Sequence, residues 1–395
     1  MATLRGEPVD RPAVNFYEIT GQEDRGGEDP FNIYSDPSWQ GLLDLARDHT
    51  DRIVMCSVGP QSDLPAKLVR QTTWLDDAGS RFTRTEISAG ERTLTALRRR
   101  DRDMNTDWMI EHPVKNADDL RAWLALPTGA GAVVAPWQPH VTERTDLRDP
   151  TWLQTAQPRH PTNIDTRGVL AAERALGDTG IAMLDTPDPL CRVAELMDME
   201  GYLVLALTEP DLMHAALERV AATLLPHIAA VAAALPGRLW RIYGPEYACP
   251  PYLPPRLFAQ YVVRYVTPMV EAIHRHGGYA RIHCHGRLAG VLDHIAATGC
   301  DALDPIEPPP LGDLTLAQVR RRVGEQMVLF GNLQIRDIET LPTPRFAEKV
   351  SAALHEGTAG RGRGFVLMPS ACPCGRKLST LAMENYRKMV ELVEA

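Results

Sequence analysis

Short apolar segments alternate with helical segments from residue 239 to the C-terminus, and this alternation restricts the possible folds sharply. The apolar segments start roughly 20–40 residues apart, which is typical of repeated βα units and a parallel sheet. Because they are apolar throughout, the strands should be buried on both faces. A closed (β/α)8 barrel and an open doubly wound sheet both fit, although no glycine-rich phosphate turn follows the first strand. The expected strands are residues 239–243, 279–282, 302–303, 327–330 and 365–368.

The N-terminal part contains an expected insertion. Residues 68–114 alternate polar and apolar side chains between turn signals, which predicts an antiparallel hairpin. Residues 128–163 are rich in glycine and proline and read as a long loop, a common feature of lids and binding segments. We therefore expect residues 1–395 to form one domain with an insertion at 68–163. The other expected elements are strands at 14–17 and 53–55 and a helix at 40–48.

Composition excludes several classes of protein. The chain has 42 Lys and Arg against 51 Asp and Glu, and this net charge of −9 disfavours nucleic-acid binding. We identify no uncharged apolar stretch of about 18 residues, so we expect no transmembrane helix. The first residues lack an apolar signal core, which favours a cytoplasmic location. In a reducing compartment, the seven cysteines favour a metal or reactive site over disulfides.

The sharpest local motif is Arg-Ile-His-Cys-His-Gly at residues 281–286, where a strand ends and a loop begins. Catalytic groups of a parallel barrel gather at this end of the strands. Because side chains alternate along an extended chain, His283 and His285 should point the same way and Cys284 the other. Two imidazoles on one side can bind zinc. The alternative is that one histidine caps a helix and the other packs in the core.

A second motif, Cys-Pro-Cys at residues 372–374, follows the last expected strand. Cys372 and Cys374 could bind a metal as thiolates, or they could be small buried side chains. Both motifs follow strands of one parallel sheet, so both should open onto the same rim. These histidines and cysteines are therefore candidates for a common metal site, and structural roles for them are the alternative.

Charged residues beyond other strand ends are further candidates. Glu307 lies in a proline-rich loop that would hold its carboxylate in place as a metal ligand, a base or a helix-dipole partner. Glu246 could act as an acid or base or bind a cationic group, although either glutamate could simply be solvated. Arg241 and Arg281, with Tyr243, are candidate substrate-binding residues, since a guanidinium can clamp a carboxylate.

Several motifs in a fixed order resemble the uroporphyrinogen decarboxylase superfamily, including its corrinoid-linked methyltransferase branch. The resemblance covers nearly the whole chain. It implies a (β/α)8 TIM barrel, and it makes a homodimer plausible. The motifs that carry it are residues 4–12, 282–286, 299–302, 330–333 and 383–386.

The resemblance also bears on the chemistry. Decarboxylase members carry an Arg-Gln-Ala-Gly-Arg segment near the N-terminus, whereas residues 15–19 here read Asn-Phe-Tyr-Glu-Ile, so uroporphyrinogen decarboxylation is not expected. Methyltransferase members bind zinc through a His-x-Cys motif and a later cysteine. His283 matches the first ligand and His285 stands at the cysteine position, while Cys372 or Cys374 matches the later one. Related methionine synthases use a glutamate 24 residues after the first histidine, which here is Glu307.

Together these features predict a zinc-dependent methyltransferase. It would move a methyl group between a small methylated substrate and a thiol or a corrinoid carrier on a partner protein. One alternative is a metal-independent decarboxylase or lyase of a small organic acid, with Arg241 or Arg281 binding the carboxylate. Another is a subunit that docks a corrinoid protein without turnover.

Overall fold

The computed structural model describes residues 1–27, 29–58, 64–127 and 164–395. Eight parallel strands form one curved sheet in the order β1-β12-β11-β10-β9-β8-β7-β2. The amide of Asp51, just before β2, donates to the carbonyl of Val14 in β1 at 2.7 Å, which joins the two ends of the sheet. The fold is therefore a TIM-type barrel, as expected. Its strands are β1 (Ala13–Val14), β2 (Arg52–Ser57), β7 (Gly180–Pro187), β8 (Leu239–Tyr243), β9 (Tyr279–His283), β10 (Ala302–Asp304), β11 (Val328–Leu333) and β12 (Phe365–Pro369).

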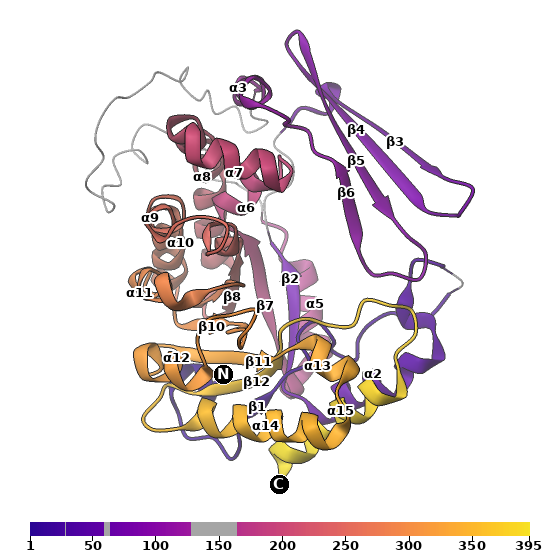
Figure 1. Ribbon diagram of the computed structural model, residues 1–395, viewed down its shortest axis with the longest axis vertical. Helices are drawn as coiled ribbons and strands as arrows, with labels where there is room; N and C mark the ends of the chain where they lie inside the picture. Colours follow the sequence, from indigo (N-terminus) through magenta and orange to yellow (C-terminus); the bar gives the residue numbers. More distant parts are fainter. Residues whose placement is uncertain (28, 59–63, 128–163) are drawn as a thin grey trace.

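Helices surround the parallel sheet (Figure 1). One of them, α8, is long and apolar enough to cross a membrane by length and composition alone. In the fold it packs against α6 and α10, and 56% of its apolar segment is buried, as suits a barrel helix. The described helices are α1 (Ala2–Arg5), α2 (Gln40–His49), α3 (Ala117–Leu124), α5 (Arg167–Leu176), α6 (Pro189–Ala194), α7 (Met199–Thr208), α8 (Pro210–Ala234), α9 (Pro255–Phe258), α10 (Arg264–Arg275), α11 (Leu292–Ala297), α12 (Leu316–Val323), α13 (Ile335–Thr340), α14 (Thr343–Thr358) and α15 (Thr380–Glu394).

Side chains alternate between the two faces of the barrel strands, and this separates an outer core against the helices from an inner core inside the barrel. In β8 and β9, Trp240, Ile242, Ala280 and Ile282 are buried against the helices. The residues between them face the barrel interior, because successive side chains of a strand point to opposite faces. The lower interior is apolar and is filled by residues such as Met183, Leu239, Ala302, Val328, Phe330, Val366 and Met368. Polar side chains therefore gather above this layer, towards the carboxyl ends of the strands.

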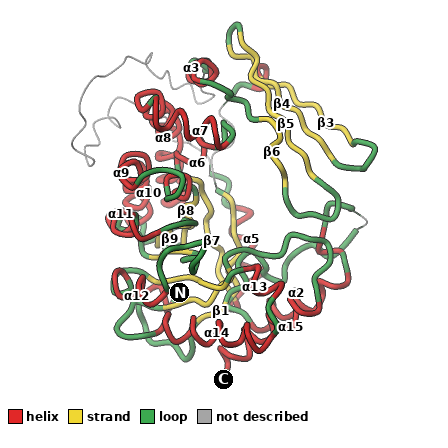
Figure 2. The backbone as a smooth tube through the Cα atoms, in the orientation of Figure 1, coloured by secondary structure: helices red, strands yellow, loops and turns green. Residues whose placement is uncertain are grey.

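The expected hairpin is a four-stranded antiparallel sheet in the order β3-β4-β5-β6, which stands beside the barrel (Figure 2). It begins after β2, and its β5–β6 turn contacts the loop that follows β12. There Met104 pairs with Gly375, and the amide of Asn105 donates to the carbonyl of Cys374 at 2.7 Å. This insertion sheet thus connects the carboxyl ends of two barrel strands. The expected loop at 128–163 lies outside the described residues. The strands are β3 (Val69–Leu75), β4 (Arg81–Ala89), β5 (Arg92–Arg100) and β6 (Asp107–Glu111).

Candidate functional site

Polar side chains of three neighbouring strands meet at the carboxyl end of the barrel. The register pairs Arg241 of β8 with Arg281 of β9, and two residues further towards the carboxyl ends it pairs Tyr243 with His283. On the other side of β9, Asp304 of β10 is paired with His283. The sequence-predicted residues of β8 and β9 therefore do lie together, and Asp304 joins them.

Arg241 is held inside a network of its own. Its guanidinium donates to both oxygens of Asp185 on β7, from Nε at 2.6 Å and from Nη2 at 3.1 Å, and Nη1 donates to the Tyr17 hydroxyl at 2.8 Å. Burial raises the pKa of the Tyr17 hydroxyl well above its ordinary value, although the Arg241 charge opposes the shift. Arg241 consequently has all three of its guanidinium nitrogens engaged.

Asp304 is a fully buried carboxylate shared by Arg281 and His283. Its Oδ2 lies 2.7 Å from Nδ1 of His283, and its Oδ1 lies 3.0 Å from Nε of Arg281. Burial alone would raise the pKa of Asp304, but the charges of Arg281 and His283 outweigh it and lower the pKa to about 2. The side chain is therefore a stable anion, and it orients the imidazole of His283.

A second imidazole–carboxylate pair lies above the first. Nδ1 of His285 is 3.2 Å from Oε1 of Glu307, and Oε2 of Glu307 accepts the amide of Gly286 at 3.1 Å. Burial opposes the charged forms of both partners, but each stabilises the other, so the pKa of His285 is raised and that of Glu307 is lowered. The rings of His283 and His285 are 4.7 Å apart at 84°.

Each histidine thus turns Nδ1 towards a carboxylate. Since a carboxylate accepts, Nδ1 carries the proton and Nε2 of the neutral ring keeps its lone pair. Histidines that bind metals are commonly held in this way. The expectation of two histidines pointing to the same side of β9 is consistent with this contact, while Cys284 is buried among the residues that pack against the helices.

The two cysteines after β12 have contacts of their own. Sγ of Cys372 is 3.6 Å from Oε2 of Glu18, and burial raises the pKa of the Cys372 thiol. Cys374 is exposed, and its carbonyl belongs to the contact with the insertion sheet. Among the described residues, no group of three or more His, Cys, Asp or Glu side chains is placed to hold a metal ion.

Glu246 follows β8 in a short turn, Pro245–Ala248, and its Oε2 accepts the amide of Gly244 at 2.9 Å. Its negative charge contributes to the raised pKa of His285, although burial of the imidazole acts against the charged form. The carboxylate therefore lies on the same rim as the histidines.

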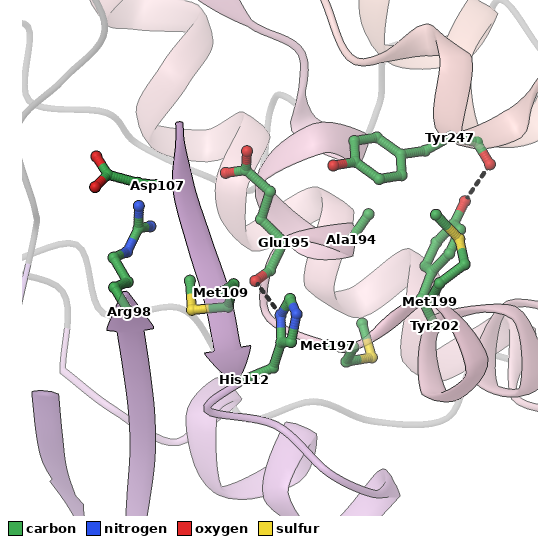
Figure 3. Close-up of a pocket in the computed structure, with 10 residues that line it drawn as sticks. All are labelled: Arg98, Asp107, Met109, His112, Ala194, Glu195, Met197, Met199, Tyr202 and Tyr247. Atoms are coloured by element: carbon green, nitrogen blue, oxygen red, sulfur yellow. Dashed lines mark hydrogen bonds between the residues drawn. The ribbon is translucent and has the colours of Figure 1, made fainter. Parts of the chain in front are cut away.

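The next residue, Tyr247, lines a pocket of about 310 Å³ between the insertion sheet and α6 and α7 (Figure 3). The Tyr247 carbonyl accepts the hydroxyl of Tyr202 at 2.9 Å, and the carbonyl of Glu195 lies 3.1 Å from Nδ1 of His112. Sequence reasoning missed this pocket because its walls come from distant segments. Its lining residues are Arg98, Asp107, Met109, His112, Ala194, Glu195, Met197, Met199, Tyr202 and Tyr247.

Sequence reasoning also gave no role to Asp185, Asp304 or Tyr17. Asp304 ends a strand, like His283, and that position was the signal that could have revealed it. Asp185 lies in β7, a strand that the sequence analysis did not predict. Tyr17 belongs to the segment that replaces the arginine-rich motif, and nothing in its local sequence indicates a hydrogen bond to Arg241.

Comparisons with known proteins agree with this architecture. The uroporphyrinogen decarboxylase family profile matches residues 188–395, slightly over half of the chain, so the chain belongs to the uroporphyrinogen decarboxylase family. Among solved structures, it is similar to a methyltransferase from Methanosarcina mazei, with a TM-score of 0.57 and 14% sequence identity over 100% of this chain and 97% of the other. At this identity the likeness establishes the fold. Comparison with curated proteins gave no match.

Proposed function

We propose that the chain is a zinc-dependent methyltransferase, which moves a methyl group between a small methylated substrate and a corrinoid carrier or a thiol. The observation that carries the proposal is the pair of adjacent imidazoles, His283 and His285, each with Nδ1 against a carboxylate. Membership of the family and the methyltransferase with the same fold support it.

Two side chains of the site, the imidazoles of His283 and His285, are chemically suited to bind zinc. His283 and His285 would bind through their Nε2 atoms, and the thiol of Cys372 or Cys374 would be the third ligand. Either thiol would have to join the histidines on metal binding, since the described residues hold no three-membered group. When bound, zinc would lower the pKa of a coordinated thiol or alcohol and make it a better nucleophile.

The chain's own residues would prepare this centre. Asp304 and Glu307 hold the Nδ1 protons and so keep both Nε2 atoms available. Glu246, held by the Gly244 amide, would receive or supply a proton at the rim. Glu307 has both oxygens engaged by His285 and Gly286, which favours an orienting role over a direct ligand role.

The first experiment measures the zinc content of tag-free protein, purified without chelator, by mass spectrometry. We expect about one zinc per chain. His283→Ala and His285→Ala should lose it, and the one of Cys372→Ser and Cys374→Ser that loses it identifies the third ligand. Matched controls are His355→Ala, an exposed histidine on α14, and Cys56→Ser, a half-buried cysteine on β2, both of which should keep their zinc.

The second measurement is methyl transfer to cob(I)alamin from a panel of methylated donors, followed by the absorbance of the corrinoid. Full zinc loading with no methyl transfer from any donor contradicts the proposal. Absence of zinc even after zinc is added also contradicts it. Turnover of organic acids that survives chelation would identify a metal-independent lyase, and tight binding of a corrinoid protein without turnover would identify a docking subunit.

A further inference from the structure

Arg281 is a buried cation with unused hydrogen-bonding capacity. Its side chain has no exposed surface, it faces the barrel interior from β9, and its Cζ lies 4.8 Å from the centre of the Phe330 ring. Its Nε lies 3.0 Å from Oδ1 of Asp304. Nη1 and Nη2 have no hydrogen-bond partner among the described residues.

Two other buried arginines of the barrel use both of their terminal nitrogens. Arg241, its register neighbour, gives all three nitrogens to Asp185 and Tyr17. Arg320 on α12 donates through Nη1 and Nη2 to backbone carbonyls, including those of Gly324 and Gly364. A buried polar group without a partner is costly, so natural structures normally satisfy such groups or use them in function. The free end of Arg281 therefore indicates a ligand.

The free donors of Arg281 favour an anionic ligand. Asp304 shares its oxygens between Arg281 and His283, and the Arg241 guanidinium lies in register beside Arg281 on the next strand. A guanidinium presents a planar fork of donors that matches the two oxygens of a carboxylate. Arg281 and His283 are two positions apart in β9, which is a rise of roughly 7 Å along the strand. An anion on Arg281 would consequently lie below the histidine pair, inside the barrel.

We propose that Nη1 and Nη2 of Arg281 bind the carboxylate of the substrate, so that the substrate is a small carboxylic acid with its reacting group towards His283 and His285. The assignment of that reacting group rests on the proposed function. The anion site itself does not, because it is defined by the side chains of β8, β9 and β10.

Isothermal titration of the purified full chain with acetate tests the site, with acetamide as the neutral isostere. We expect saturable acetate binding, no acetamide binding, and a loss of about 10- to 100-fold in acetate affinity in Arg281→Gln. Arg281→Lys, which keeps the charge but lacks the fork, should fall between them. Arg321→Gln removes an exposed arginine from α12 and should bind acetate like the wild type. Thermal unfolding of each variant verifies that it is folded.

The titration is repeated after chelation of zinc. Acetate binding that disappears with zinc but persists in Arg281→Gln would mean that acetate binds the metal, and it would overturn the inference. Wild-type affinity in Arg281→Gln, equal binding of acetate and acetamide, or no acetate binding would also overturn it.

The two proposals can fail separately. Acetate binding that depends on Arg281, without methyl transfer from any donor, would support the anion site and reject the proposed function. Methyl transfer from donors without a carboxylate, at the same kcat/KM in the wild type and Arg281→Gln, would support the proposed function and reject the assignment of the substrate as a carboxylic acid held by Arg281.

Discussion

Asp304→Asn removes one negative charge from the centre of the site and keeps the size of the side chain. In the folded protein, the Asp304 carboxylate has no exposed surface and lies 3.0 Å from Nε of Arg281 and 2.7 Å from Nδ1 of His283. The asparagine would leave the Arg281 charge buried without its anion. It would also give His283 a weaker acceptor, so the imidazole would be held less firmly.

The expected loss of stability follows from these distances. Two unit charges 3.0 Å apart attract by about 5.5 kcal/mol at an effective dielectric constant of about 20. Desolvation offsets part of this attraction, and the removal of one member of a buried pair typically costs about 3–5 kcal/mol. We therefore expect the free energy of unfolding of Asp304→Asn to fall by about 3–5 kcal/mol at pH 7. Urea denaturation followed by fluorescence of the seven tryptophans measures it.

The pH dependence gives a second check. The pKa of Asp304 is lowered to about 2 in the folded protein, against about 3.9 in an unfolded chain. Its contribution is therefore fully present above about pH 4 and is lost as the pH falls towards about 2. The difference between wild type and Asp304→Asn should be constant from pH 5 to pH 7 and shrink below about pH 4.

A double variant shows whether the buried charge is the cause. Arg281→Met removes the unpaired cation, so adding it to Asp304→Asn should recover part of the lost stability. An unfolding midpoint of Asp304→Asn equal to that of the wild type would refute the reasoning. A deficit that stays unchanged down to pH 3, or a double variant whose loss is the sum of the single losses, would also refute it.

Three further changes test other contacts. Glu307→Ala leaves His285 without its Nδ1 acceptor and should weaken zinc binding about 10- to 100-fold in competition with a chelator, and unchanged affinity would argue against an orienting role. A hydrogen bond to Asp301 raises the pKa of His274, and burial of the imidazole opposes the shift less strongly. Because the pair is partly exposed, it stabilises the fold by at most about 1 kcal/mol. This contribution is fully present below about pH 6.5 and is lost as the pH rises through the raised pKa of His274. His274→Gln should therefore unfold more easily than the wild type at pH 5.5 but not at pH 9, and equal deficits would contradict this. Gly244→Ala places a methyl group against neighbouring side chains at φ +118° and should cost at least about 1–3 kcal/mol in thermal unfolding, whereas an unchanged Tm would show that the turn relaxes freely.

Local sequence was sufficient for much of the barrel. The strand predictions at 239–243 and 279–282 match β8 and β9 to within one residue, because continuous apolar runs between helices have few other solutions. The helix predicted at 40–48 is also present as α2, and the expected hairpin region holds the insertion sheet. β7 was not predicted, although its sequence is largely apolar.

Part of the site also follows from local pattern. Neighbouring parallel strands end at one rim, so residues placed at their carboxyl ends or just after them, such as His283, His285 and Glu307, come together there. The same argument predicted Cys372 and Cys374 on this rim as well, but among the described residues they form no metal-binding group with the histidines. Their loop is long, and its course depends on hydrogen bonds to the insertion sheet, which is distant in sequence.

The difference between Arg241 and Arg281 arises entirely from long-range contacts. Both are arginines at the third position of an apolar strand, and local sequence makes them equivalent. In the folded chain, β7 brings Asp185 and the N-terminal segment brings Tyr17 to Arg241, whereas Arg281 shares Asp304 with His283. A guanidinium is fully hydrogen-bonded only where the fold brings enough acceptors to it from distant segments. The fold does this for Arg241, whereas Nη1 and Nη2 of Arg281 stay open to a ligand.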